Sequence, residues 1–117
     1  MLSASCDTRP DTIQYGPSGL TATWFQVDGT EVRTAAQWNE IKRVIAYKVD
    51  CWAYDLICIS FGTAEGAFEV NEEMEGWEGL TEALPVYLPG ALERSEWWDE
   101  ILLPPFAANG TTLFSAK

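Results

Sequence analysis

Asp55-Leu56-Ile57-Cys58-Ile59-Ser60-Phe61 is the most apolar run of this chain, and it decides the fold class. Apolar side chains occupy both of its alternating faces, which is typical of a strand at the centre of a sheet. In the preceding run, Arg43–Val49, one alternating face is more apolar than the other, which predicts a strand that is better buried on one side. The few residues between the two runs are too short for a parallel crossover, so we expect an antiparallel hairpin.

A second hairpin is predicted upstream. The β-rich run Leu20–Val27 is followed by Asp28-Gly29, a dipeptide typical of tight hairpin turns, and Glu31–Thr34 then provides the returning strand. The capping-box pattern at Thr34–Gln37 predicts a single helical turn that extends through Ile41.

Downstream of the central run, the apolar period changes to that of a helix, with Trp77, Leu80 and Leu84 on one face. This part is expected to contain, in order, a short strand at Ala67–Val70, a helix over Gly76–Leu84 that ends at Pro85, a short helix capped by Ser95, and a last strand at Thr111–Ser115.

Strands arranged as consecutive hairpins and followed by helices predict the α+β class. The expected fold is an antiparallel sheet of four to six strands followed by two short C-terminal helices. We expect a single α+β domain over residues 20–117. Prolines and glycines interrupt residues 1–19, so we expect an irregular N-terminal arm there.

Charge is distributed unevenly along the chain. The 117 residues carry a net charge of −11 and contain no histidine, and Val49–Glu93 contains ten acidic residues but no Lys or Arg. Such a surface repels nucleic acid and anionic membranes and attracts basic proteins. We therefore expect a basic protein partner, and neither a nucleic acid nor a membrane. The sequence does not predict the oligomeric state.

The missing histidines exclude several kinds of chemistry. Neither a Ser-His-Asp triad nor a Cys-His pair can form, and three scattered cysteines cannot build a tetrahedral zinc site. No phosphate-binding glycine motif is present. We therefore expect a protein that is not an enzyme, with no catalytic residue, no cofactor and no metal site. No membrane-length apolar run and no signal-peptide pattern occur, so the expected location is cytoplasmic.

Six tryptophans are spread through the chain. Trp38 and Trp77 occupy periodic apolar positions that favour burial in a core. Trp52 lies at the expected hairpin tip between acidic residues, which is typical of a binding hot spot, although burial remains an alternative. Trp97 and Trp98 are adjacent on the second helix, so we expect one of them to lie at a rim or interface.

The acidic residues also permit two interpretations. Those that precede the first helix stabilise its positive N-terminal end, and the same carboxylates together with nearby aromatic rings would form a negative surface that docks into a cationic groove. The residues predicted to bind a partner are Asp50, Trp52, Asp55, Glu72, Glu73, Glu75, Trp77, Glu78 and Trp98.

Several segments within residues 38–111 carry a recognisable pattern. They are Trp38-x-x-Ile41-x-x-Val44-x-Ala46-Tyr47-Lys48-x-Asp50, Tyr54-Asp55-Leu56-Ile57-Cys58, Phe68-x-Val70-x-Glu72-Glu73-Met74-x-Gly76-Trp77-x-x-Leu80, Ala83-Leu84-Pro85 and Pro105-Phe106-Ala107-x-Asn109-x-Thr111. The pattern resembles small acidic bacterial proteins associated with polymorphic-toxin loci, some of the immunity-protein type. The first half more loosely resembles pleckstrin-homology-like domains, but their basic lipid-binding loop is not evident here.

The leading hypothesis is therefore a non-enzymatic immunity protein that neutralises a basic bacterial toxin domain through an acidic surface containing aromatic residues. One alternative is a small carboxylate-dependent or carbohydrate-binding domain that uses tryptophan rings as platforms. Another is a pleckstrin-homology-like adaptor.

Overall fold

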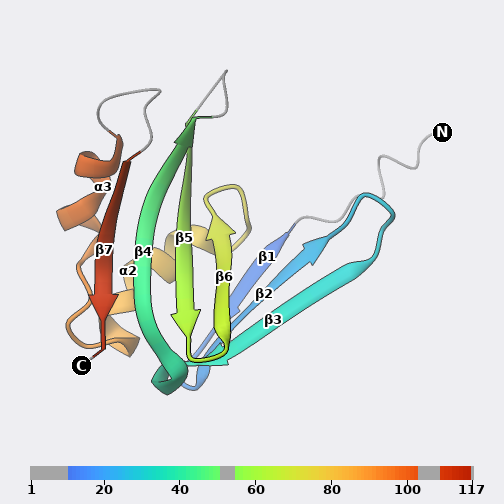
Figure 1. The fold of residues 1–117 in the computed structure, drawn as a ribbon, viewed down its shortest axis with the longest axis horizontal. Helices are drawn as coiled ribbons and strands as arrows, with labels where there is room; N and C mark the ends of the chain where they lie inside the picture. Colours follow the sequence, from blue (N-terminus) through green and yellow to red (C-terminus); the bar gives the residue numbers. More distant parts are fainter. Residues whose placement is uncertain (1–10, 51–54, 103–108, 117) are drawn as a thin grey trace.

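The computed structural model describes residues 11–50, 55–102 and 109–116, and Figure 1 shows their arrangement. Within these residues the chain forms seven strands, one 3₁₀ turn and two α-helices. In chain order the elements are β1 (Thr12–Tyr15), β2 (Gly19–Phe25), β3 (Glu31–Gln37), η1 (Trp38–Glu40), β4 (Ile41–Asp50), β5 (Asp55–Thr63), β6 (Gly66–Asn71), α2 (Trp77–Tyr87), α3 (Arg94–Leu102) and β7 (Asn109–Ser115).

The strands form two antiparallel sheets, one of order β1-β2-β3 and one of order β6-β5-β4-β7. The predicted α+β class is therefore confirmed. The most apolar run, β5, lies between β4 and β6, as expected for a central strand; Phe61 pairs with Val44 on one side and with Phe68 on the other. The structure differs from the expectation in dividing the strands between two sheets, and in the pairing of β7 with β4 after the helices.

The chain passes between the two sheets through η1. The predicted helical turn exists but begins later than Thr34, because β3 continues to pair with β2 as far as Gln37. The capping box consequently forms between Gln37 and Glu40, and the Gln37 N–H donates to Glu40 Oε1 at 2.8 Å. The Trp38 indole N–H donates to the Gly16 carbonyl at 2.6 Å, which ties this 3₁₀ turn to the turn between β1 and β2.

The prediction of an irregular N-terminal arm is wrong for Thr12–Tyr15, which forms β1. Residues 1–10 of that predicted arm lie outside the described residues. β1 pairs with β2, and on its other side the Ile13 N–H donates to the Glu75 carbonyl at 2.7 Å. Ile13 itself is buried. One of the two partners of this strand thus comes from a segment about sixty residues away, and local proline and glycine content does not reveal it.

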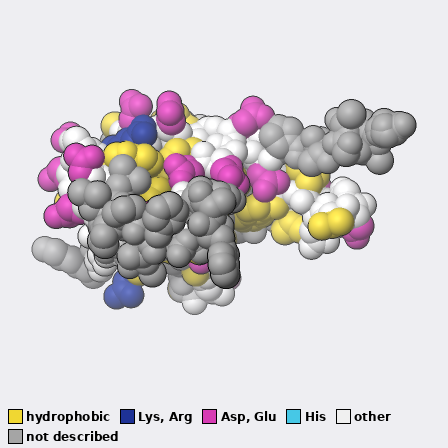
Figure 2. Space-filling model, turned by 90° about the horizontal axis from the view of Figure 1, so that it is seen from above, with side chains coloured by type: hydrophobic (Ala, Val, Ile, Leu, Met, Phe, Trp, Pro, Cys, Tyr) yellow, Lys and Arg dark blue, Asp and Glu magenta, His cyan; other side chains and the backbone are white. Residues whose placement is uncertain are grey.

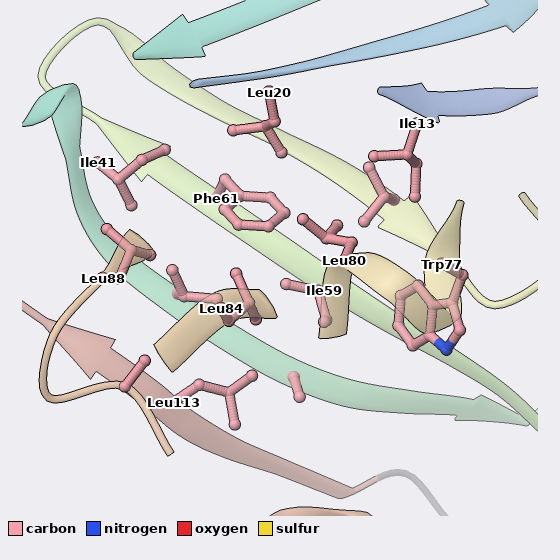
Figure 3. Close-up of a cluster of buried hydrophobic side chains, with 14 of the residues drawn as sticks. Ile13, Leu20, Ile41, Ile59, Phe61, Trp77, Leu80, Leu84, Leu88 and Leu113 are labelled. Carbon is pink, nitrogen blue, oxygen red and sulfur yellow. The ribbon is translucent and has the colours of Figure 1, made fainter. Parts of the chain in front are cut away.

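The core lies on one face of the four-stranded sheet, beneath α2, α3 and the smaller sheet (Figure 3). The inward side chains of β5, Ile57, Ile59 and Phe61, have no exposed surface. Leu80 and Leu84 of α2 point toward them, and both are fully buried. Removal of apolar surface from water at these positions stabilises the contact between the sheet and the helices.

Helix α2 continues through Pro85 to Tyr87, so the prediction that Pro85 ends it is wrong. A proline inside a helix cannot donate to the carbonyl four residues earlier. Packing on both sides of the proline offsets this loss, because Leu84 and Leu88 are buried and the Tyr87 ring stacks on Trp38 at 5.0 Å. No helix in the described part of the chain is both long and apolar enough to cross a membrane.

The packing of α2 yields a stability test. Replacement of Leu84 by Ala should lower the free energy of unfolding by about 2–5 kcal/mol, because it leaves a cavity in the core. The matched control on the same helix is Val86→Ala, which should change stability by no more than about 0.5 kcal/mol because Val86 is 73% exposed. Guanidinium denaturation followed by circular dichroism measures both. Similar losses for the two variants would contradict this placement of α2.

Candidate functional site

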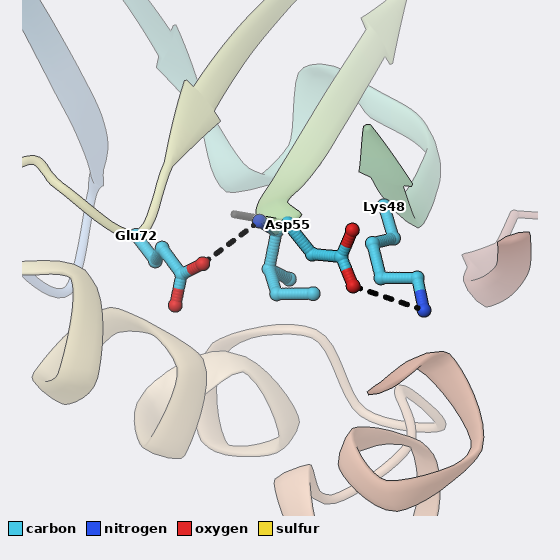
Figure 4. Close-up of polar contacts among 4 residues, drawn as sticks. Lys48, Asp55 and Glu72 are labelled. Atoms are coloured by element: carbon cyan, nitrogen blue, oxygen red, sulfur yellow. Dashed lines mark hydrogen bonds and ion pairs between the residues drawn. The ribbon is translucent and has the colours of Figure 1, made fainter. Parts of the chain in front are cut away.

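Asp55, one of the predicted partner-binding residues, is held within the fold (Figure 4). Its Oδ2 lies 3.6 Å from Nζ of Lys48, and the two side chains are 15% and 0% exposed. Lys48 pairs with Ile57 on the inner face of the sheet. A buried ammonium is costly unless a carboxylate accompanies it. Asp55 therefore stabilises the fold by accompanying the buried ammonium of Lys48 where β5 begins.

Glu72 and Trp77 are also directed into the fold. Glu72 Oε1 accepts a hydrogen bond from the Ile57 N–H at 3.0 Å, which fastens the segment after β6 to β5 (Figure 4). The Trp77 side chain is 3% exposed and belongs to the core cluster. This burial contradicts the prediction that Trp77 forms part of a binding surface, and agrees with the periodicity that favoured a core position.

Asp50 and Trp52 cannot be placed in the site. The backbone of Asp50 ends β4, opposite Asp55. The side chain of Asp50 and the whole of Trp52 lie outside the described residues.

Glu73, Glu75 and Glu78 are exposed at the junction between β6 and α2. The junction is anchored to the smaller sheet, since the Glu75 N–H donates to the Asp11 carbonyl at 3.0 Å. Gly76 follows with a φ of +97°, and the Ile13 carbonyl occupies the space that a Cβ would need there. This turn starts α2 with Glu78 in its first turn, where a carboxylate is stabilised by the helix dipole.

Helices α2 and α3 meet at Arg94. Its Nη1 lies 3.9 Å from Oε1 of Glu82, and its guanidinium lies 4.7 Å from the centre of the Trp98 ring. Trp97 is fully buried, whereas Trp98 is half-buried and contacts Trp97 edge to face at 5.7 Å. The expectation that one member of this pair lies at a rim is confirmed, and Trp98 is that member.

The predicted partner-binding residues do not include the exposed acids of α3. They alternate with the buried positions Trp97 and Ile101, and this helical alternation was the available signal. We call the exposed acids on and beside the two helices the acidic helical layer. It consists of Glu75, Glu78, Glu82, Glu93, Glu96, Asp99 and Glu100. Figure 2 shows acidic side chains gathered at the end of the molecule where α3 lies, with few Lys or Arg side chains among them.

A separate cleft of about 670 Å³ opens between β3 and the β5–β6 turn. Glu40, Lys42 and Glu65 are among its lining residues, and Phe68 is its aromatic residue. No tryptophan lines it, so it lacks the ring platforms expected of a sugar-binding cleft. Within residues 11–50, 55–102 and 109–116, no group of three or more acidic or cysteine side chains is placed to hold a metal ion.

Tyr47 lies on the outer face of the larger sheet, opposite Cys58 of β5. Burial raises the pKa of the Tyr47 hydroxyl above its usual value of 10, and its hydrogen bond to Glu69 acts in the same direction. The phenol is therefore neutral at physiological pH and serves as a hydrogen-bond donor to Glu69.

The pairing of Lys48 with Asp55 leads to a second prediction. Asp55→Ala should lower the free energy of unfolding by about 3 kcal/mol, because it leaves the buried ammonium without this carboxylate. Lys48→Met, which replaces the ammonium by an apolar side chain of similar length, should cost clearly less. Urea denaturation of both variants measures the difference. A larger loss for Lys48→Met would show that the ammonium itself holds this region together.

Comparison of the chain with models of protein families, with curated proteins and with solved structures finds no match. The functional argument therefore depends on the charges and contacts of this chain's own residues.

Proposed function

We propose that this protein binds a basic protein partner through the acidic helical layer, and that it acts as an immunity-type inhibitor of a bacterial toxin domain. The observation that carries the proposal is the exposed set of carboxylates on and beside α2 and α3, where Arg94 contacts both Glu82 and the half-buried Trp98. Arg94 is the only basic residue between Val49 and Leu102, and it already contacts Glu82 and Trp98.

Electrostatics give such a surface a defined kind of partner. Carboxylates on an exposed layer raise the association rate with a cationic surface and repel nucleic acid. A toxin that acts on nucleic acid presents a cationic active site, which this layer would cover. In the proposed complex, Glu78 and Glu82 pair with Lys or Arg of the partner, and the Trp98 ring, which Arg94 links to Glu82, supplies apolar contact area.

The geometry gives less support to the alternative of a carboxylate-dependent or carbohydrate-binding domain. The carboxylates of the helical layer lie on the outside of the fold and do not face one another across a cleft, as a carboxylate-dependent hydrolase requires. The proposed setting is the cytoplasm, where the buried Cys58 side chain stays a thiol.

The proposal predicts a face-specific and salt-dependent interaction. Wild-type protein immobilised as bait in lysate of its native host should retain a basic protein, which mass spectrometry identifies. The double reversal Glu78→Lys/Glu82→Lys should weaken the purified complex by about tenfold or more at about 50 mM NaCl, and by less at about 500 mM, because salt shortens the screening length.

The matched control is Glu65→Lys/Glu69→Lys, which changes the net charge equally but lies on the β5–β6 hairpin. It should leave binding within about twofold of the wild type. If both double variants weakened binding equally, net charge alone would explain the interaction. An affinity that does not change with ionic strength would contradict the proposed mechanism. Co-expression of the captured partner with the wild type and with each variant then tests whether binding suppresses toxicity.

A further inference from the structure

Strand β3 is an edge strand with hydrogen-bonding groups that face away from its sheet. The Gln26 N–H donates to the Thr30 carbonyl at 2.8 Å, and the Trp38 N–H donates to the Ser18 carbonyl at 3.2 Å. Because backbone direction alternates along a strand, even-numbered residues of β3 direct their N–H and C=O groups toward β2. Glu31, Arg33 and Ala35 direct theirs outward, and the described residues place no strand on that side.

The two halves of the β3 edge differ in how easily another molecule can reach them. The C-terminal half, Thr34–Ala36, lines the cleft opposite Ala64–Phe68. The N-terminal half belongs to the β2–β3 arm, which projects away from the larger sheet (Figure 1). A strand from another molecule would therefore reach Glu31 and Arg33 more easily than the cleft.

We propose that this edge pairs with the same edge of a second copy of the chain, antiparallel and centred on Val32. The inference does not depend on the proposed function. In this register Glu31 of each copy forms a hydrogen-bonded pair with Arg33 of the other. Four backbone hydrogen bonds form between the copies, all from groups that face outward in the monomer.

Charge selects this register among those that a two-fold axis permits. A centre on Arg33 opposes two guanidinium groups, and a centre on Glu31 opposes two carboxylates, both of which destabilise a cross-strand pair. A centre on Thr34 would require the second copy to enter the cleft, and it uses the Gln37 N–H, which already donates to Glu40. Within each copy Arg33 Nη2 already lies 2.9 Å from Glu31 Oε2. The centre on Val32 sets these two ion pairs side by side, with opposite charges facing each other across the contact.

The same register covers apolar surface on the arm. Trp24 pairs with Val32 across β2 and β3, and these side chains lie on the face of the sheet that carries the core residues Leu20 and Ala22. Val32 is nevertheless 37% exposed, because the arm extends beyond the core. In the dimer, the two copies of Val32 become direct neighbours between the two copies of Trp24, which forms an apolar row across four strands, β2 and β3 of each copy.

The net charge of −11 opposes association of two copies, but its distribution limits this effect. The arm and α3 lie at opposite ends of the longest axis of the molecule (Figure 1), which extends 51 Å. Contact through the arms therefore keeps the α3 acids of the two copies far apart, and salt screens exposed charges beyond about 10 Å at about 0.1 M.

Charge exchange tests the register directly. Sedimentation equilibrium of the wild type over a concentration series should show a monomer of 13.0 kDa in reversible equilibrium with a dimer. Glu31→Arg and Arg33→Glu, each alone, should raise the dimer dissociation constant by about tenfold, because each opposes like charges twice. The combined variant Glu31→Arg/Arg33→Glu should restore dimerisation, since the opposite charges again face each other. All three changes lie at exposed positions, and circular dichroism confirms that the variants fold.

Cross-linking provides a second readout. The central pair of this register does not exchange hydrogen bonds, and such pairs have Cα atoms about 4.5 Å apart, which suits a disulfide. Val32→Cys should therefore form a covalent dimer on mild oxidation, whereas Thr34→Cys, the matched control on the same face, should resemble the wild type. The proposal would be overturned if the wild type remained a monomer at every concentration, or if the charge exchange left the dimer dissociation constant unchanged. Preferential cross-linking of Thr34→Cys would also overturn it.

Discussion

The register between β4 and β5 is the constraint on which the rest of this structure depends. Its pairing sets Ile57, Ile59 and Phe61 on the inner face, where α2, α3 and the smaller sheet pack. A shift of one residue would turn these side chains to the outer face and remove the core. The contact of Lys48 with Asp55 adds a second condition, because a shifted strand would bury the ammonium away from its carboxylate.

The fold could be predicted from the sequence where neighbouring residues determine it. The apolar pattern of Asp55–Phe61 and the Asp28-Gly29 turn are local signals, and the strands that they predict are present. β1 and the continuation of α2 through Pro85 depend on contacts with distant segments: the backbone of Glu75 in one case, and the ring of Trp38 in the other. Proline and glycine content reflects only the local conformational preference of the chain. In β1 and at Pro85, tertiary packing overrides that preference.

The candidate site, too, could be predicted only where neighbouring residues determine it. The sequence predicts the sign of the charge and the region that carries it, and Glu73, Glu75 and Glu78 are exposed there. Glu72 cannot be told apart from its neighbours by sequence, because its role depends on an N–H of β5 that lies near it only in the folded chain. The acids of α3 join the surface because Arg94 connects that helix to Glu82, a contact that sequence spacing does not predict.

The position of β7 has a consequence for the chain before folding is complete. The other strand pairs of this fold join segments that are consecutive in sequence, whereas β4 must pair with a strand that follows both helices. Until β7 arrives, one side of β4 is an open edge, the kind of surface on which partly folded proteins aggregate. An inward-pointing charge on an edge strand disfavours such association. Lys48 provides one on the inner face of β4, so we expect the ammonium that Asp55 accompanies in the finished protein to disfavour such association before β7 pairs.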